Sequence, residues 1–259
     1  MAITAQDVKN LREMTGCGMM DCKKALAASE GDMDKAIEWL REKGLAASAK
    51  KAGRIAAEGM AYACVVDGIG VAVEVNAETD FVGKNEKFVD FVKGVANTVA
   101  KCNPADLDAL MECKYDGTDL TVLQQQQEMV LVIGENIKVR RFARFEGGFS
   151  VPYIHAGGKI GVLVNLEVTG GIDATEIGKD MAMQIAALNP RFWDKSQVTQ
   201  DVLDEEKKIM LAQMANDPKM ASKPDQVKEK IVLGKLNKFY SENCLLQQAV
   251  LRVELVEFA

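Results

Sequence analysis

The chain has little of what most enzyme active sites require. Its 259 residues include one histidine, five prolines and 6% aromatic residues. With His155 alone, neither a Ser-His nor a Cys-His pair of the kind that activates a nucleophile is in evidence. The phosphate-binding patterns Gly-x-x-x-x-Gly-Lys-[Ser/Thr] and Gly-x-Gly-x-x-Gly are absent as well. We therefore expect a protein without covalent chemistry of its own, without catalytic residues and without a cofactor.

Positive charge and long apolar runs are also scarce. The formal net charge is −6 and the isoelectric point is about 5.1, whereas a nucleic-acid footprint needs clustered Lys and Arg. No apolar run approaches the ~20 residues of a membrane span. The first residues lack the basic and apolar segments of an export signal. These absences predict a cytoplasmic protein that binds neither nucleic acid nor membrane.

Cysteine is present but is not arranged for a metal site. The six cysteines form no Cys-x-x-Cys pair, and the single histidine is far from all of them in sequence. Zinc ligands normally recur at short, fixed spacings. We expect six free thiols and no metal, at positions Cys17, Cys22, Cys64, Cys102, Cys113 and Cys244.

Residues 1–54 have the pattern of a small helical domain followed by a connector. Apolar residues recur at helical spacing, and glycines punctuate the segment. The alanine- and lysine-rich stretch 46–57 is predicted to be a helical connector. The three expected helices begin after Thr4, at Met19 and after Asp32, and the third is expected to end at Lys43-Gly44.

From Glu58 the apolar period changes to two, and an internal repeat follows. Tyr62 precedes an Ile-Gly-Val hairpin strand at 69–73, and Tyr153 precedes another at 160–164 with the same spacing. Each hairpin is expected to lead into a helix that ends at Asn-Pro and then into a later strand. The order predicts an α+β fold, with two related modules of antiparallel sheet and helices. The two helices are expected to end at Asn-Pro 103–104 and 189–190, and the later strands are expected at 137–145 and 250–255. The two subdomains are predicted to span residues 55–147 and 148–259.

The second module contains an insertion at about 197–240 that is predicted to be a helical hairpin. Residues 198–214 have a helical pattern, Asn216-Asp217-Pro218 breaks it, and Lys223-Pro224 opens a second helix. Neither helix keeps a strict heptad. Packing of the hairpin on its module and projection as a coiled-coil arm are both open, and so is homodimer formation through it.

The segment Asn76-Ala-Glu-Thr-Asp-Phe-Val82 lies where a strand pattern stops and a helix pattern begins. Asp80 can cap or face the start of that helix. Phe81 is a large apolar residue at a corner, where chains are usually polar. It either packs under the first helical turn as a hydrophobic staple or is offered to a partner.

Several short motifs follow one another in order along the chain. They are TGCGMMDCKKAL at 15–26, KKAGR at 50–54, TDFV at 79–82, IGENI at 133–137, YIH at 153–155, IGVLV at 160–164 and CLL at 244–246. With this order the whole chain resembles the bacterial elongation factor Ts family. After Gln248, however, it runs at once into 250–258, where family members usually have a longer segment before the last strand.

The resemblance implies a guanine-nucleotide exchange factor for elongation factor Tu, which releases GDP so that GTP can load. It implies a ubiquitin-associated-like N-terminal domain, a core of two similar subdomains and a coiled-coil hairpin. Carried over by motif, Thr79, Asp80, Phe81 and Val82 would contact the partner near its magnesium and phosphate region. The remaining partner contacts would be Arg12, Met19, Met20, Lys23, Ile133, Gly134 and His155.

Two other functions are compatible with parts of the sequence. A ubiquitin-associated-type adaptor without exchange activity would explain residues 1–53 but leaves the two-module core without a role. An enzyme that uses the thiol of Cys22 or Cys64 as its nucleophile would lack a base, since His155 is distant in sequence.

Overall fold

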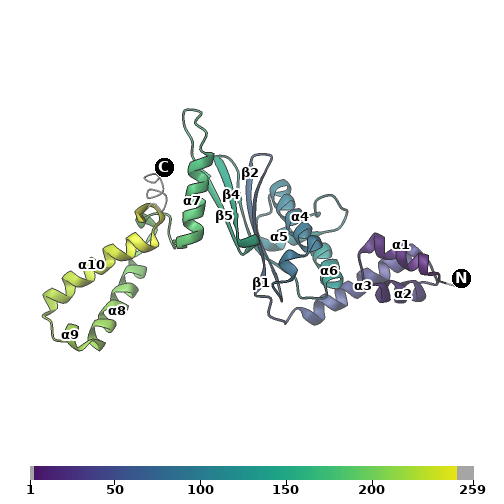
Figure 1. Cartoon of the computed structure of the whole chain (residues 1–259), viewed down its shortest axis with the longest axis horizontal. Coiled ribbons are helices and arrows are strands. Elements are labelled where there is room, and N and C mark those ends of the chain that lie inside the picture. The colour runs from purple at the N-terminus through teal and green to yellow at the C-terminus, as the bar shows by residue number, and fades with distance from the viewer. Residues whose placement is uncertain (1–2, 250–259) are drawn as a thin grey trace, which may run out of the picture. The chain divides into compact units, whose positions relative to one another are not determined.

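Residues 3–249 are described by the computed structural model and form an α+β protein, as predicted (Figure 1). They group into two compact units that divide between Ala182 and Met183. The three-part division at 1–54, 55–147 and 148–259 stays a prediction. The strand expected at 250–255 lies outside the described residues. Within the described part, every helix is too short or too polar to pass through a lipid bilayer.

The N-terminal helices form a small bundle with its own core. They are α1 (Ala5–Thr15), α2 (Met19–Ala28) and α3 (Met33–Lys51). As predicted, Thr4 caps α1, in a capping box with Asp7, and Asp32 caps α3 through the amide of Lys35. The bundle core consists of Val8, Leu11, Cys17, Cys22, Ala25, Leu26, Ala36 and Leu40.

The prediction that α3 ends at Gly44 is wrong, because the helix continues through this glycine to Lys51. A Cβ placed on Gly44 would lie 3.3 Å from the backbone oxygen of Gln127 in α6 (Val122–Ile133). Gly44 therefore allows two helices to approach closely and does not stop one. Arg41 of α3 also pairs with Glu128 of α6, with Nε and Oε1 3.3 Å apart.

A three-stranded antiparallel sheet forms the centre of the first unit. Its strands are β1 (Glu58–Val66), β2 (Ile69–Ala77) and β3 (Lys138–Phe145), in the order β1-β2-β3. The helices α4 (Glu86–Cys102), α5 (Leu107–Glu112) and α6 lie together beside it (Figure 1). The helix pattern predicted after the corner is confirmed, and the apolar residues that recur along α4 at helical spacing are all buried: Phe88, Phe91, Val92, Val95 and Val99.

A second antiparallel hairpin, β4 (Phe149–His155) and β5 (Ile160–Leu166), packs against β1 and β2. Glycines allow the close approach, since a Cβ on Gly70 would lie 2.3 Å from the Ser150 hydroxyl oxygen. The helix α7 (Thr175–Leu188) follows this hairpin, and its Gly178 lies against Val151 of β4.

The described part of the repeat has the predicted order of hairpin, helix and Asn-Pro, and in both copies the asparagine is left-handed. Asn103 after α4 has φ 48° and Asn189 after α7 has φ 45°. Asparagine tolerates this conformation, and the proline that follows cannot continue a helix. The two hairpins differ in register, because Tyr62 pairs with Val73 whereas Tyr153 pairs with Val162.

The second unit contains the predicted helical hairpin. Its helices α8 (Gln200–Asn216) and α10 (Asp225–Asn243) pack on each other, and the short α9 (Pro218–Ala221) connects them. Asp217 caps α9 at the predicted break. Two small clusters of buried residues hold the hairpin together. One consists of Val198, Phe239 and Cys244, and the other of Met214, Val232 and Leu236.

Candidate functional site

The corner after β2 presents an aromatic side chain to solvent. Phe81 is 81% exposed, whereas its neighbour Val82 is 5% exposed and belongs to the core beneath the sheet. The hydrophobic-staple interpretation of Phe81 is therefore wrong, because a staple would be covered. The aromatic ring stands outside a corner that Val82 anchors from within.

Asp80 does not cap the helix that follows, contrary to one of its two predicted roles. Asn85 is the N-cap of α4, and its Oδ1 accepts a hydrogen bond of 3.0 Å from the amide of Lys87. A 3-10 turn, Val82–Lys84, lies between Asp80 and α4. The Asp80 side chain is exposed and makes no hydrogen bond with any described residue, so its carboxylate is free to meet a group outside the chain.

The corner is fixed by a neighbouring loop through two carboxylates. Thr79 donates twice to Glu135, from its amide at 3.0 Å and from its hydroxyl at 2.7 Å. In the opposite direction, the amide of Asn136 donates to Glu78 at 2.7 Å. Arg54 adds a 3.5 Å contact to the same Glu78 oxygen, and its carbonyl accepts from the Asn136 side chain at 2.8 Å.

Sequence reasoning did not identify this set of positioning residues. Thr79 and Glu135 are far apart in the chain, and only the sheet brings them together. Because β2 pairs with β3 up to Asn76 and Lys138, the loop after β2 and the loop before β3 leave the sheet side by side. The signal was present in the IGENI motif at 133–137, of which only the first two residues were assigned a role.

Ile133 and Gly134 lie next to this corner, at the end of α6. Gly134 is exposed and closes the helix with φ 87°, a conformation that favours glycine. Nothing lies within 4 Å of the position a Cβ would take. Ile133 is half-buried against the core of the sheet. The chain then turns directly into Glu135, so the pair flanks the residue that holds Thr79.

His155 ends β4 and is brought to the same end of the stacked hairpins. The turn that follows it, Ala156–Gly158, contacts the turn Val82–Lys84 after Phe81. His155 is exposed, and its Nδ1 is 2.9 Å from the Tyr153 hydroxyl with the two rings stacked. The tyrosine fixes the orientation of the imidazole without covering it.

The four predicted contact residues of the N-terminal bundle are exposed on α1 and α2. Met19 is 56% and Met20 62% exposed, because Cys22, Ala25 and Leu26 already fill the inner face of α2. Arg12 and Lys23 are exposed charges. A hydrogen bond joins the bundle to α4 near the corner, since Lys87 Nζ donates to the carbonyl of Gly16 at 3.1 Å.

Comparison with known proteins places these features in one family. The family model described as Elongation factor TS matches residues 78–254. The chain is 47% identical over 253 residues to Elongation factor Ts of Syntrophotalea carbinolica, covering 96% of the chain and 82% of the relative. It is 50% identical over 253 residues to that of Clostridium perfringens strain 13, covering 95% and 82%. The corresponding protein of Magnetococcus marinus is 44% identical over 252 residues, covering 96% and 82%.

The chain belongs to the elongation factor Ts family. The predicted resemblance is confirmed, and with it a role as an elongation factor in protein biosynthesis.

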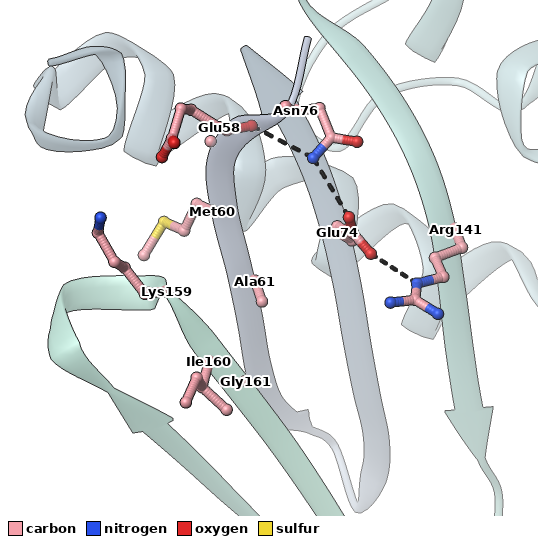
Figure 2. Close-up of a pocket in the computed structure, with 12 residues that line it drawn as sticks. Glu58, Met60, Ala61, Glu74, Asn76, Arg141, Lys159, Ile160 and Gly161 are labelled. Atoms are coloured by element: carbon pink, nitrogen blue, oxygen red, sulfur yellow. Dashed lines mark hydrogen bonds and ion pairs between the residues drawn. The ribbon is translucent and has the colours of Figure 1, made fainter. Parts of the chain in front are cut away.

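A polar pocket of about 320 Å³ in this elongation factor Ts chain lies beside the start of β1 (Figure 2). Glu74 and Arg141 point toward each other across the strands, and Asn76 donates to Glu74 as well. Burial would raise the pKa of Glu74, but the hydrogen bonds from Arg141 and Asn76 lower it. The Glu74 carboxylate is thus already paired, which suits a structural role better than an acid–base one.

Neither cysteine considered as a nucleophile in this family member, Cys22 or Cys64, is in an environment that favours a reactive thiolate. All six are free thiols, as predicted, and Cys22 is fully buried. Burial raises the pKa of Cys64, which disfavours the reactive thiolate. Among residues 3–249, no three potential ligands cluster as a metal site. The alternative of a thiol enzyme therefore has no support in the geometry.

Proposed function

We propose that this chain is the guanine-nucleotide exchange factor for elongation factor Tu. In this proposal it binds the GDP-bound partner and disturbs the partner's magnesium and phosphate region, so that GDP leaves and GTP can load. The observation that carries the proposal is the exposed Phe81 ring at a corner braced on both sides. Family membership supports it, because the chain is an elongation factor of the Ts type.

An exposed benzyl ring on a rigid corner is suited to entering a pocket of a partner. Leaving a phenylalanine in water forgoes about 1.5–3 kcal/mol of burial free energy, which a partner pocket can recover. Aromatic anchors of this kind dominate interface energies. Asp80 places a carboxylate beside the ring, where it can compete with other anions for the partner's donors or metal. Thr79 and Val82 act in the proposal as the two supports of the ring.

The other predicted contact residues fit a second and a third point of attachment. Met19 and Met20 offer exposed, flexible apolar side chains, and Arg12 and Lys23 add exposed charges, a combination that suits an adaptable contact with a helix. Ile133 and Gly134 directly precede Glu135, and the turn after His155 contacts the turn Val82–Lys84, so all three would extend the contact surface at the corner.

Binding of the factor and binding of the nucleotide must oppose each other. By linkage, GDP weakens the complex by the same factor by which the complex weakens GDP. Each tenfold increase in the rate of GDP release requires about 1.4 kcal/mol less activation free energy. Loss of magnesium coordination and of one phosphate-loop contact can supply several such steps.

The substitution Phe81→Ala tests the proposal directly. We expect the variant to keep its fold, because the ring is outside the core, but to lose most of its exchange activity, by at least tenfold. The measurement is the rate of release of a fluorescent GDP analogue from elongation factor Tu in a stopped-flow instrument.

A matched control is Ile172→Ala, which shortens another exposed apolar side chain (69% exposed) away from the corner. It should accelerate GDP release as well as the unchanged protein does. If Phe81→Ala accelerates GDP release as fast as the unchanged protein, the role of the ring is refuted.

The remaining aspects of the proposal follow from this mechanism. The factor makes and breaks no covalent bond, uses no cofactor, and needs neither nucleic acid nor membrane. Its place of action is the cytoplasm, where its partner works in translation. Homodimer formation through the hairpin of α8 and α10 is not required by the mechanism and stays a prediction.

A further inference from the structure

We infer that Glu135 is a positioning residue for nucleotide exchange: its carboxylate holds Thr79 and thereby fixes where Phe81 stands. This inference rests on the exchange function proposed above. Glu135 does not touch the ring. From the loop that precedes β3, Glu135 holds Thr79, which lies two residues before Phe81 in the chain.

The contact between Glu135 and Thr79 joins two donors of one residue to two oxygens of one carboxylate. The amide of Thr79 donates to Oε2 at 3.0 Å and the hydroxyl to Oε1 at 2.7 Å. Hydrogen bonds to a charged acceptor are stronger than neutral ones, and a two-point contact also fixes orientation. Thr79 is therefore held in direction as well as in position.

A second hydrogen bond, in the opposite direction between the same two loops, adds to the attachment of the corner to the loop before β3. Glu78 accepts from the amide of Asn136, while Glu135 accepts from the amide of Thr79. Each of two neighbouring loops thus supplies one carboxylate and one backbone amide. These bonds extend the β2–β3 pairing beyond its last residues, Asn76 and Lys138.

The two ends of the short segment that carries Phe81 are fixed differently. Val82 is inserted into the core on one side, and Thr79 is held by Glu135 on the other. Between them, Asp80 and Phe81 have exposed side chains, and the carbonyl of Phe81 accepts a hydrogen bond of 3.2 Å from the amide of Lys84 in the turn that follows. Without Glu135 the segment would have to be ordered during binding, which lowers affinity and slows productive insertion.

The substitution Glu135→Gln tests the inference with little change of shape. A glutamine keeps one acceptor but replaces the second by a donor, which cannot receive a bond from Thr79. We expect GDP release from elongation factor Tu to be accelerated about tenfold less, which equals about 1.4 kcal/mol in activation free energy. Thr79→Val, which removes the hydroxyl donor, should have a similar effect, and Thr79→Ser, which keeps it, should recover most of the loss.

The matched control is Glu146→Gln at the opposite end of β3. Like Glu135→Gln, it removes one negative charge. The contact that it weakens, between Glu146 Oε2 and Arg144 Nη1 at 2.7 Å, is as short as the one between Glu135 and the Thr79 hydroxyl. Its exchange activity should equal that of the unchanged protein. Circular dichroism of every variant at the assay temperature separates a loss of exchange from a loss of folded protein.

A double substitution distinguishes positioning from a general structural role. If Glu135 acts through the ring, adding Glu135→Gln to Phe81→Ala should cause no further loss of exchange activity. Independent, multiplying losses would overturn the inference, as would full activity of both Glu135→Gln and Thr79→Val while Phe81→Ala is slow. Full activity of Phe81→Ala would refute the role of the ring, and the inference with it, whereas an unchanged protein that does not accelerate GDP release would refute the proposed function itself.

Discussion

The missing side chain of Gly94 in the middle of α4 makes room for an aromatic ring. A Cβ at this position would lie 1.9 Å from the Tyr115 hydroxyl oxygen. That hydroxyl donates to the carbonyls of Asp90 and Phe91, at 3.2 and 3.3 Å, and the ring stacks on Phe91. Glycine is unfavourable inside a helix, so its presence here reflects the packing of Tyr115 against the helix backbone.

We predict opposite effects of alanine at two helical glycines. Gly94→Ala should lower the free energy of unfolding by about 1–3 kcal/mol, because Tyr115 must move or lose its hydrogen bonds. Gly234→Ala in α10 has nothing within 4 Å of the new Cβ, so it should stabilise its helix by up to about 1 kcal/mol. Denaturant unfolding of both variants measures the two changes. A stabilised Gly94→Ala variant would contradict the assigned packing.

At the residue scale, the sequence of the corner predicts the position of Phe81 in the chain but not the direction in which its ring points. The order strand, corner, helix was predictable at Phe81 from the change of apolar period. Whether its ring packs inside or outside was not, because both choices satisfy the same pattern. The outcome depends on Val82 filling the core position and on Asn85 providing the cap, both of which are set by the path of the chain in three dimensions.

At the scale of elements, the sequence predicted well the helix ends that are set by nearby residues. It did not predict the features that are set by contacts between distant parts of the chain. Thr4, Asp32 and Asn103 mark helix boundaries through bonds or conformations within a few residues of themselves. The prediction that α3 ends at Gly44 was wrong, because a glycine is needed there for the close approach of the Gln127 backbone in another helix. The bonds between Thr79 and Glu135 were missed for the same reason, since the pairing of β2 with β3 creates them.

The C-terminal end of α4 offers a test of the local signal. Asn103 has φ 48° and ψ 55°, and its amide donates to the carbonyl of Val99. Most residues with a Cβ are strained there by roughly 1–2 kcal/mol, whereas glycine is not and asparagine tolerates the conformation. Asn103→Ala should therefore lower the free energy of unfolding by about 1 kcal/mol, and Asn103→Gly should leave it unchanged or higher. Equal stability of the two variants in urea unfolding would argue against a conformational role for this residue.

At the scale of the whole molecule, each unit has its own core and its own fluorescent probe. The chain has two tryptophans: Trp39 lies in the first unit and Trp193 in the second. Each unit also holds a titrating group whose pKa is strongly shifted, Tyr115 in the first and Asp194 in the second. Burial, with smaller contributions from Asp90 and Asp116, raises the pKa of Tyr115 to about 12. Hydrogen bonds from Ser196 and Gln247 lower the pKa of Asp194 to about 2.

These two groups contribute stability that is lost at opposite ends of the pH scale. The neutral Tyr115 is favoured in the folded first unit, so its contribution is complete below pH 10 and is lost as pH rises toward 12. With about 1.4 kcal/mol for each pKa unit, the loss is of the order of 2–3 kcal/mol. The ionised Asp194 is favoured in the folded second unit, so its contribution is present above pH 4 and is lost as pH falls toward 2.

Unfolding followed by single-tryptophan variants, with Trp39 or Trp193 replaced by Phe, measures each unit separately. Tyr115→Phe should weaken the alkaline dependence reported by Trp39 between pH 10 and 12, and Asp194→Asn should weaken the acid dependence reported by Trp193 between pH 4 and 2. Each substitution serves as the control for the other unit, whose pH dependence it should leave unchanged. If Tyr115→Phe leaves the Trp39 profile as steep as before between pH 10 and 12, burial of the phenol is not its cause.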